Sequence, residues 1–258
     1  MISKSGVQSY RQRLEATVAN PLTYTSRGYY LFVLLLLAIV GWGVYAYTVE
    51  LRYGLMATGM RDVVMWGLYL VNFVFFIGIS HAGTLISAIL RVSHAGWRTP
   101  ITRMAEMITV VAIMIGALMP IIDLGRPDRV ANIFIFGRFQ SPLVWDIISI
   151  TSYLTGSLIY LYLPLIPDLA MLRDRFAKKG AGLRQRIYKV LSVGWQDTPE
   201  QKKRLEKAIG IMALIIIPVA VSVHTVVSFV FSMTLRPGWD STVFGIYFVI
   251  GAIFSGIA

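Results

Sequence analysis

The sequence predicts an all-α, polytopic membrane protein with about six transmembrane helices. Hydrophobic residues make up 56% of its 258 residues. Only 14% of the residues are charged, whereas about 25% is usual in soluble domains. The apolar residues also fall into separate stretches that are long enough to cross a bilayer.

The charge distribution favours a lipid bilayer as partner and argues against nucleic acid. The net charge is +11, but most Lys and Arg residues lie in loops between the apolar stretches, which is typical of topology signals. The chain has no cysteine, so cysteine-ligated iron–sulfur clusters and thioether-linked haem cannot be held by it. We expect no metal site, and we place any such redox centre in a partner subunit.

Six apolar stretches define the expected helices. A polar segment, residues 1–28, precedes the first helix, and a long basic loop, residues 168–207, interrupts the later ones. The last stretch is still apolar where the sequence stops, so we expect the start of a further helix and a longer protein. The predicted spans are 29–49, 63–90, 104–122, 142–167, 208–231 and 242–258.

The loop charges predict the orientation of these helices. Basic residues concentrate in cytoplasmic loops. The segments 1–28, 91–103 and 168–207 are the basic ones, and they share one side if every helix crosses the membrane. The N-terminus is therefore expected in the cytoplasm, and the link 123–141 is expected on the extracytoplasmic side.

Two acids at one link are the main functional candidates. Asp123 closes one predicted helix, and Asp146 lies about one turn inside the next. The link between them is short, so we expect both carboxylates near one membrane level, with Arg126 offsetting their charge. Trp145 is the stacking candidate beside them. The group forms either a salt-bridge cluster that fixes the loop or a pocket that takes protons from an amphiphilic substrate such as a quinol.

Two histidines in apolar helices raise the possibility of a haem. His81 and His224 lie on opposite sides of the middle of their predicted spans, which gives a depth gap of about 14 Å. We therefore expect no haem b in this chain. A proton-relay or ligand-facing role is favoured for His81, and an interhelical hydrogen bond is an equal alternative for His224. Glu106 is expected to be a paired charge near a helix end rather than a channel residue.

Several motifs resemble a known family. Asp-Leu-Gly-Arg-Pro at 123–127 resembles the signature of the NrfD/polysulfide-reductase membrane subunits, which interact with quinones and carry no cofactor of their own. Further motifs are similar to the quinol-oxidising membrane subunit (ActC) of bacterial alternative complex III. They are Ile79–Thr84, Ser141–Asp146, Leu165–Ala170, His224–Phe229 and Pro237–Trp239.

The resemblance implies a fold of two four-helix bundles, of which residues 63–231 would form the first. It implies a menaquinone or ubiquinone site at the extracytoplasmic end of that bundle, in a bacterial cytoplasmic (inner) membrane. The implied partners are an iron–sulfur subunit, multihaem cytochrome c subunits and a second homologous membrane subunit. The residues expected to handle the quinol protons are Asp123, Asp146 and His81. Those expected to bind the quinone are the same three with Arg126 and Trp145, and a proton path would use His224, Glu106 and Asp240.

Some positions depart from the family pattern, and two other functions remain open. His is frequent in relatives where this chain has Asp123 and Asp240, and an acid is frequent where it has Val230. One alternative function is the quinone-linked membrane anchor of a polysulfide- or nitrite-type molybdopterin reductase. The other is a non-redox scaffold or transporter subunit, in which the acids would be structural pairs.

Overall fold

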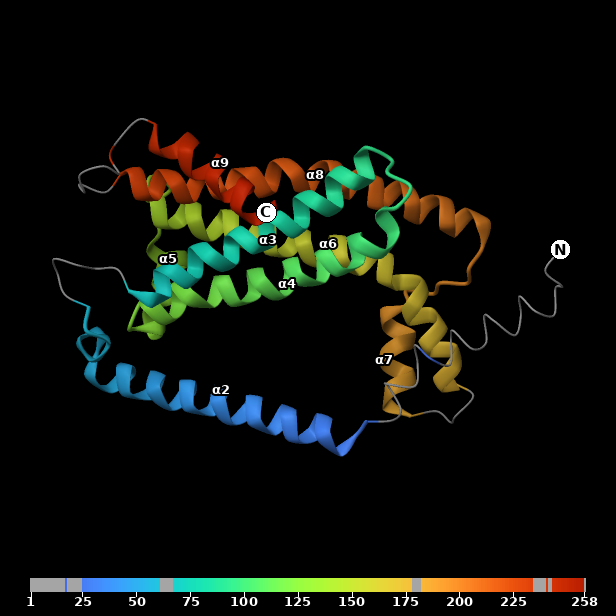
Figure 1. Ribbon diagram of the computed structural model, residues 1–258, viewed down its shortest axis with the longest axis horizontal. Helices are drawn as coiled ribbons and strands as arrows, with labels where there is room; N and C mark the ends of the chain where they lie inside the picture. Colours follow the sequence, from blue (N-terminus) through green and yellow to red (C-terminus); the bar gives the residue numbers. More distant parts are fainter. Residues whose placement is uncertain are drawn as a thin grey trace. The chain divides into compact units, whose positions relative to one another are not determined.

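The all-α prediction is confirmed (Figure 1). The computed structural model describes residues 17, 25–60, 67–177, 182–233, 240 and 243–257, and the regular structure in these ranges is helical throughout. The chain divides into two compact units, Met1–Gly59 and Met60–Ala258.

The first unit contains one long apolar helix, α2 (Arg27–Tyr53). Its 27 residues extend about 40 Å, enough to cross a bilayer. The Ser26 hydroxyl caps the helix by accepting a hydrogen bond from the Tyr29 amide. Gly54, with φ 74°, ends it and leads into the short 3₁₀ helix η2 (Leu55–Thr58). Within its own unit, most side chains of α2 are exposed.

The second unit is built on four long helices. Three short helices, η3, α5 and α7, lie in the links between the long ones, and α9 follows the last link. The long helices are α3 (Leu68–Val92), α4 (Arg98–Asp123), α6 (Pro142–Ala177) and α8 (Pro199–Ser232), and the others are η3 (Pro127–Arg129), α5 (Val130–Phe136), α7 (Leu183–Leu191) and α9 (Phe244–Ile257).

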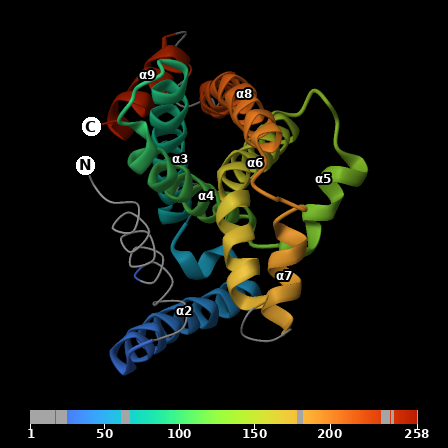
Figure 2. The same cartoon turned by 90° about the vertical axis from the view of Figure 1, so that its right-hand side faces the viewer.

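The four long helices pack into a closed bundle (Figure 2). α3 lies against both α4 and α8, and α6 lies against the same two helices from the other side. Helix α9 packs on α3 and α8, and α7 packs on α6. The apolar core includes Phe73, Ile77, Ile113, Tyr153 and Ile216, all buried. One end of the bundle carries the ends of α4 and α8 and the starts of α3 and α6.

Five helices in the described residues, namely α2, α3, α4, α6 and α8, are long and apolar enough to span a membrane. The protein is therefore a multi-pass membrane protein. Helix α9 is also apolar, but its 14 residues extend only about 21 Å, less than the bilayer core.

Several predicted boundaries differ from the structure, including the start of α4 at Arg98 rather than at Met104. The stretch 168–207 was expected to be a loop, but α6 continues to Ala177 and α8 already begins at Pro199. Charged residues end the part of a helix that lies in lipid, but they do not end the helix itself. The span predicted from Val63 begins as helix at Leu68, after an extended Gly67, while its first four residues lie outside the described residues.

A glycine sets the close approach of α3 and α4. A Cβ atom added at Gly83 would lie 2.6 Å from the carbonyl oxygen of Ala105 on α4. Small residues allow the backbones of membrane helices to approach in this way. In the small-residue run 78–83, Gly83 is therefore a position of close helix contact. Gly78 is not, because nothing lies within 4 Å of a Cβ atom added there.

We expect Gly83→Ala to destabilise the bundle by about 1–3 kcal/mol, because the added methyl group must push α4 away. Gly78→Ala is the matched control on the same helix, and it should leave stability unchanged or raise it slightly. Thermal unfolding of both variants in detergent tests this. Equal midpoints for the two variants would contradict the contact.

Candidate functional site

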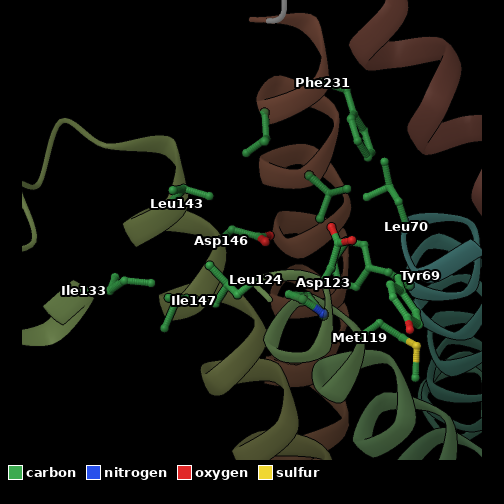
Figure 3. Close-up of a pocket in the computed structure, with 14 residues that line it drawn as sticks. Tyr69, Leu70, Met119, Asp123, Leu124, Ile133, Leu143, Asp146, Ile147 and Phe231 are labelled. Atoms are coloured by element: carbon green, nitrogen blue, oxygen red, sulfur yellow. The ribbon is translucent and has the colours of Figure 1, made fainter. Parts of the chain in front are cut away.

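A cavity of about 260 Å³ lies at the bundle end formed by the end of α4 and the start of α6 (Figure 3). Its wall is apolar apart from two carboxylates and the hydroxyl of Tyr69. Helices α3, α4, α5, α6 and α8 all contribute to it. The lining residues are Tyr69, Leu70, Phe73, Met119, Pro120, Asp123, Leu124, Ile133, Leu143, Asp146, Ile147, Val227, Val230 and Phe231.

The structure brings Asp123 and Asp146 together in this cavity, as the sequence predicted. Asp123 is the last residue of α4, and Asp146 is the fifth residue of α6. Figure 3 shows both carboxylates directed into the same space between the helices. The Oδ1 atom of Asp146 is buried and has no hydrogen-bond partner among the described residues. A buried carboxylate oxygen without a donor needs a ligand, a water or a proton to satisfy it.

Arg126 does not lie between the two acids. It is exposed in the turn after α4 and pairs with Asp128 at 3.1 Å. This guanidinium holds the pKa of the Asp128 carboxyl below its usual range, and the same hydrogen bond raises the pKa of Arg126. The expectation that Arg126 offsets the charge of the cavity acids is therefore wrong in this structure. Asp128 is only two residues from Arg126 and is exposed, whereas the cavity carboxylates lie inside the bundle, so the guanidinium pairs with Asp128.

Trp145 also has a different role from the one expected. Its indole N–H donates a hydrogen bond to the carbonyl of Phe139, in the link that precedes α6. Trp145 is not among the residues that line the cavity. It fixes the entry of the chain into α6, and so it positions its neighbour Asp146 rather than stacking on a ligand.

The two histidines are in direct contact, contrary to the predicted depth gap. The ring centroids of His81 and His224 are 4.0 Å apart, and the ring planes are nearly perpendicular. The gap was inferred by aligning the middles of the two spans, but α3 begins later than predicted, and side-chain packing sets the offset between α3 and α8. A haem between these rings would have to separate them.

His81 belongs to the bundle interior rather than to the cavity. It is buried, and its Nδ1–H donates to the carbonyl of Ile77 at 2.7 Å. Its ring stacks on that of Tyr153, with centroids 4.4 Å apart. The Nε2 atom of His81 is buried without a partner among the described residues. His81 does not line the cavity, so it would not contact a ligand bound there.

Tyr153 is the central polar residue that the sequence reasoning missed. Its hydroxyl donates to the carbonyl of Ser80 at 2.9 Å and shares a hydrogen bond with the hydroxyl of Thr84 at 2.6 Å. Thr109 on α4 donates to the same Ser80 carbonyl at 3.0 Å. These contacts join α3, α4 and α6. A signal was present, because α6 carries polar residues at helical spacing along one face, namely Asp146, Ser149, Tyr153, Ser157 and Tyr160.

Glu106 lies deep in the bundle and is not a paired charge at a helix end. It is 2% exposed, and Ser87 donates to its Oε1 atom at 2.6 Å. Its Oε2 atom has no partner among the described residues. The arginine near it in sequence, Arg103, pairs instead with Asp168 on α6 at 2.5 Å. The proton-path candidate Asp240 is exposed in the link between α8 and α9 and does not line the cavity.

Comparison with known proteins identifies the family. The model of the polysulphide reductase NrfD family matches residues 56–258. The chain belongs to this family. The broader of the two resemblances found in the sequence is therefore confirmed.

Three relatives of this NrfD-family chain carry descriptive names. A putative dimethyl sulfoxide reductase membrane subunit of Halobacterium salinarum is 31% identical over 229 residues, which is 88% of this chain and 49% of the relative. A selenate reductase subunit of Mesobacillus selenatarsenatis is 28% identical over 240 residues, 89% of this chain and 54% of the relative. An Hdr-like menaquinol oxidoreductase integral membrane subunit of Archaeoglobus fulgidus is 26% identical over 133 residues, 52% of this chain and 33% of the relative.

These relatives refine the family prediction. The chain spans about half the length of the first two. The names of those two describe subunits of reductases, and none of the three is named as part of alternative complex III. The match therefore supports the wider NrfD family and not the ActC resemblance specifically.

Tyr153→Phe tests the interior of the bundle. Loss of the hydroxyl leaves Thr84 and the Ser80 carbonyl with one partner fewer inside the bundle, so we expect stability to fall by about 1–3 kcal/mol. Tyr162→Phe is the matched control on α6. Its hydroxyl donates to the exposed carbonyl of Leu191, which water can satisfy. Thermal unfolding should show a clearly larger loss for Tyr153→Phe, and equal losses would contradict the central role of Tyr153.

Proposed function

We propose that this NrfD-family chain is the quinone-binding membrane subunit of a reductase complex of the molybdopterin type. The observation that carries the proposal is the apolar cavity with two converging carboxylates, Asp123 and Asp146, at one end of the bundle. The names of the relatives support it, since two are reductase subunits and one is a menaquinol oxidoreductase subunit. Electrons from quinol would leave through an iron–sulfur subunit to the reductase subunit.

The dimensions of the cavity suit a quinone head group. Its volume of about 260 Å³ is below the roughly 300–1,000 Å³ typical of pockets that enclose a whole drug-sized ligand. A ring with two oxygens would fill it, while a long isoprenoid tail would remain in lipid. The apolar walls suit a ligand that partitions into the bilayer, and menaquinone and ubiquinone both have this character.

The carboxylates supply the chemistry that quinol oxidation needs. Oxidation of a quinol releases two protons with two electrons, so acceptors must lie within hydrogen-bond reach of its hydroxyls. Asp146 is suited to this role because its Oδ1 atom is buried and lacks a donor among the described residues. Asp123 faces the same space. Asp146 would accept the first proton and Asp123 the second.

Orientation and a proton route complete the proposal. The basic segments of the sequence predict a cytoplasmic N-terminus, and with that orientation the cavity would face the extracytoplasmic side of the cell membrane. Inside the bundle, the pair His81–His224 and the buried Glu106 would carry protons along the polar face of α6. Asp240, exposed between α8 and α9, would lie at the outer surface rather than on this route.

A second candidate is the quinol-oxidising subunit of an alternative complex III-like assembly. The motifs at Ser141–Asp146 and His224–Phe229 favour it. Its partners would be multihaem cytochrome c subunits and a second homologous membrane subunit, besides the iron–sulfur subunit. The cavity and its acids serve both candidates, so the partners distinguish them.

The cavity acids can be tested by substitution in the assembled complex. We expect Asp146→Asn to lower quinol-dependent electron transfer at least 100-fold, because general-base catalysis contributes about 10²–10⁴-fold. Arg126→Gln and Asp128→Asn are controls in the same link, and they should change the rate less than about twofold, because they form an exposed pair. The decisive comparison uses the double variant that combines Asp146→Asn with Asp123→Asn. If it transferred electrons from quinol as fast as the unmodified complex, the proposal would be overturned.

Purification of the native complex tests the choice of partner. We expect a molybdenum-containing subunit and an iron–sulfur subunit to co-purify in mild detergent, together with bound quinone. A reduced-minus-oxidised spectrum with c-type haem bands and no molybdenum would instead favour the alternative complex III-like assembly. A complex with neither quinone nor redox subunits would contradict both.

A further inference from the structure

The short helix α7 presents an apolar face with no protein cover in the described structure. Leu183 is 75% exposed and Val190 is 76% exposed, and Ile187 and Leu191 on the same side are also exposed. At 100° per residue these four side chains fall within an arc of about 100°. In a water-soluble segment the apolar side would turn toward the protein. Here the sides that carry Gln185 and Tyr188 are the less exposed ones.

Basic residues flank this apolar face. Arg184 follows one edge of the arc and Arg186 the other, while Lys189 lies on the opposite side of the helix. All three are exposed, and none forms an ion pair with another residue that the structure describes. The sequence of α7 contains no acidic residue. An apolar stripe between long basic side chains is the pattern of a helix that lies in a membrane interface.

The bundle holds α7 in the orientation that such a helix needs. Figures 1 and 2 show α7 running across the direction of the bundle helices, alongside the last turns of α6. The Phe176 and Tyr188 rings stack 5.5 Å apart, and Tyr162 donates to the Leu191 carbonyl at 2.6 Å. Because the bundle helices cross the membrane, α7 lies along its plane.

The position of α7 along the bundle agrees with an interface. Helix α6 runs from the cavity end, and the stretch from Pro142 to Leu165 already extends about 36 Å, enough to cross the hydrocarbon core. The part of α6 that contacts α7 begins at Tyr162 and continues to Phe176. The contact region therefore starts where α6 leaves the lipid and continues into the headgroup layer.

We propose that α7 is an interfacial helix that binds the anionic headgroups of the lipid leaflet opposite the cavity. Leu183, Ile187 and Val190 would enter the acyl boundary, and Arg184 and Arg186 would contact phosphate groups beside them. This inference is independent of the proposed function, because it uses no residue of the cavity or of the polar interior. Charge complementarity selects anionic phospholipid as the occupant of this face.

Depth measurements on the full chain test the proposal, and the absence of cysteine makes single labelling sites simple to introduce. Nitroxide labels on Val190→Cys and Lys189→Cys would be compared in vesicles of phosphatidylcholine mixed with phosphatidylglycerol. We expect the label at 190 to be accessible to oxygen and shielded from a nickel chelate, and the label at 189 to show the reverse. Equal chelate access at both sites would overturn the proposal. So would a label at 190 that is shielded from both the chelate and oxygen, since a protein contact would then be covering it.

Two double substitutions that remove the same charge distinguish a lipid site on α7 from general electrostatic attraction between the protein and an anionic membrane. Each basic residue near an anionic surface changes binding roughly fivefold. We therefore expect Arg184→Gln with Arg186→Gln to lower the ratio of embedded to exposed label at 190 by about 25-fold in phosphatidylglycerol vesicles. Lys203→Gln with Arg204→Gln is the matched control at the exposed start of α8, with the same loss of charge, and it should change the ratio less than about twofold. Equal decreases would show attraction by net charge alone and would overturn the assignment to α7.

Discussion

The hydroxyl of Tyr153 is the contact on which the bundle most depends. In a membrane, burial of apolar side chains does not drive helices together, because lipid is equally apolar, so close packing and interhelical hydrogen bonds carry more of the association. Tyr153 bonds to Ser80 and Thr84 on α3, and Thr109 ties α4 to the same carbonyl. Gly83 allows α4 to come this close. The same group of contacts sets the offset between helices, and with it the place where their ends meet.

The cavity is a consequence of that arrangement. Its acids stand at a helix end and a helix start, so their meeting requires α4 and α6 to reach the same level. The protein gains a pair of carboxylates in an apolar setting, where one buried oxygen lacks a donor among the described residues. Such a group is costly for stability. A ligand with hydroxyl groups would offset this cost by donating a hydrogen bond to the buried carboxylate. This is how the fold is connected to the proposed quinol chemistry.

Some residues predicted for the site could be placed from the sequence and others could not, depending on where in the chain their partners lie. Asp123 and Asp146 could be placed from the sequence because both lie next to a short link, which restricts them to one end of the bundle. Arg126 lies in the same link, but a long flexible side chain can turn either way, and Asp128 draws it outward. His81 and His224 come from helices far apart in sequence. Their separation could not be derived from span midpoints, because the offset between helices depends on side-chain sizes on both.

The sequence alone determined the membrane class, most of the spans, the family and the two acids at the cavity end. These follow from local properties: hydropathy belongs to single stretches, and a motif or a helix end is read along the chain. Only the tertiary structure decided that the histidines touch, that Tyr153 joins three helices and that Glu106 is buried rather than paired. It also decided that α7 turns its apolar face outward. Each of these depends on the register and rotation of packed helices, which arise from contacts between distant residues.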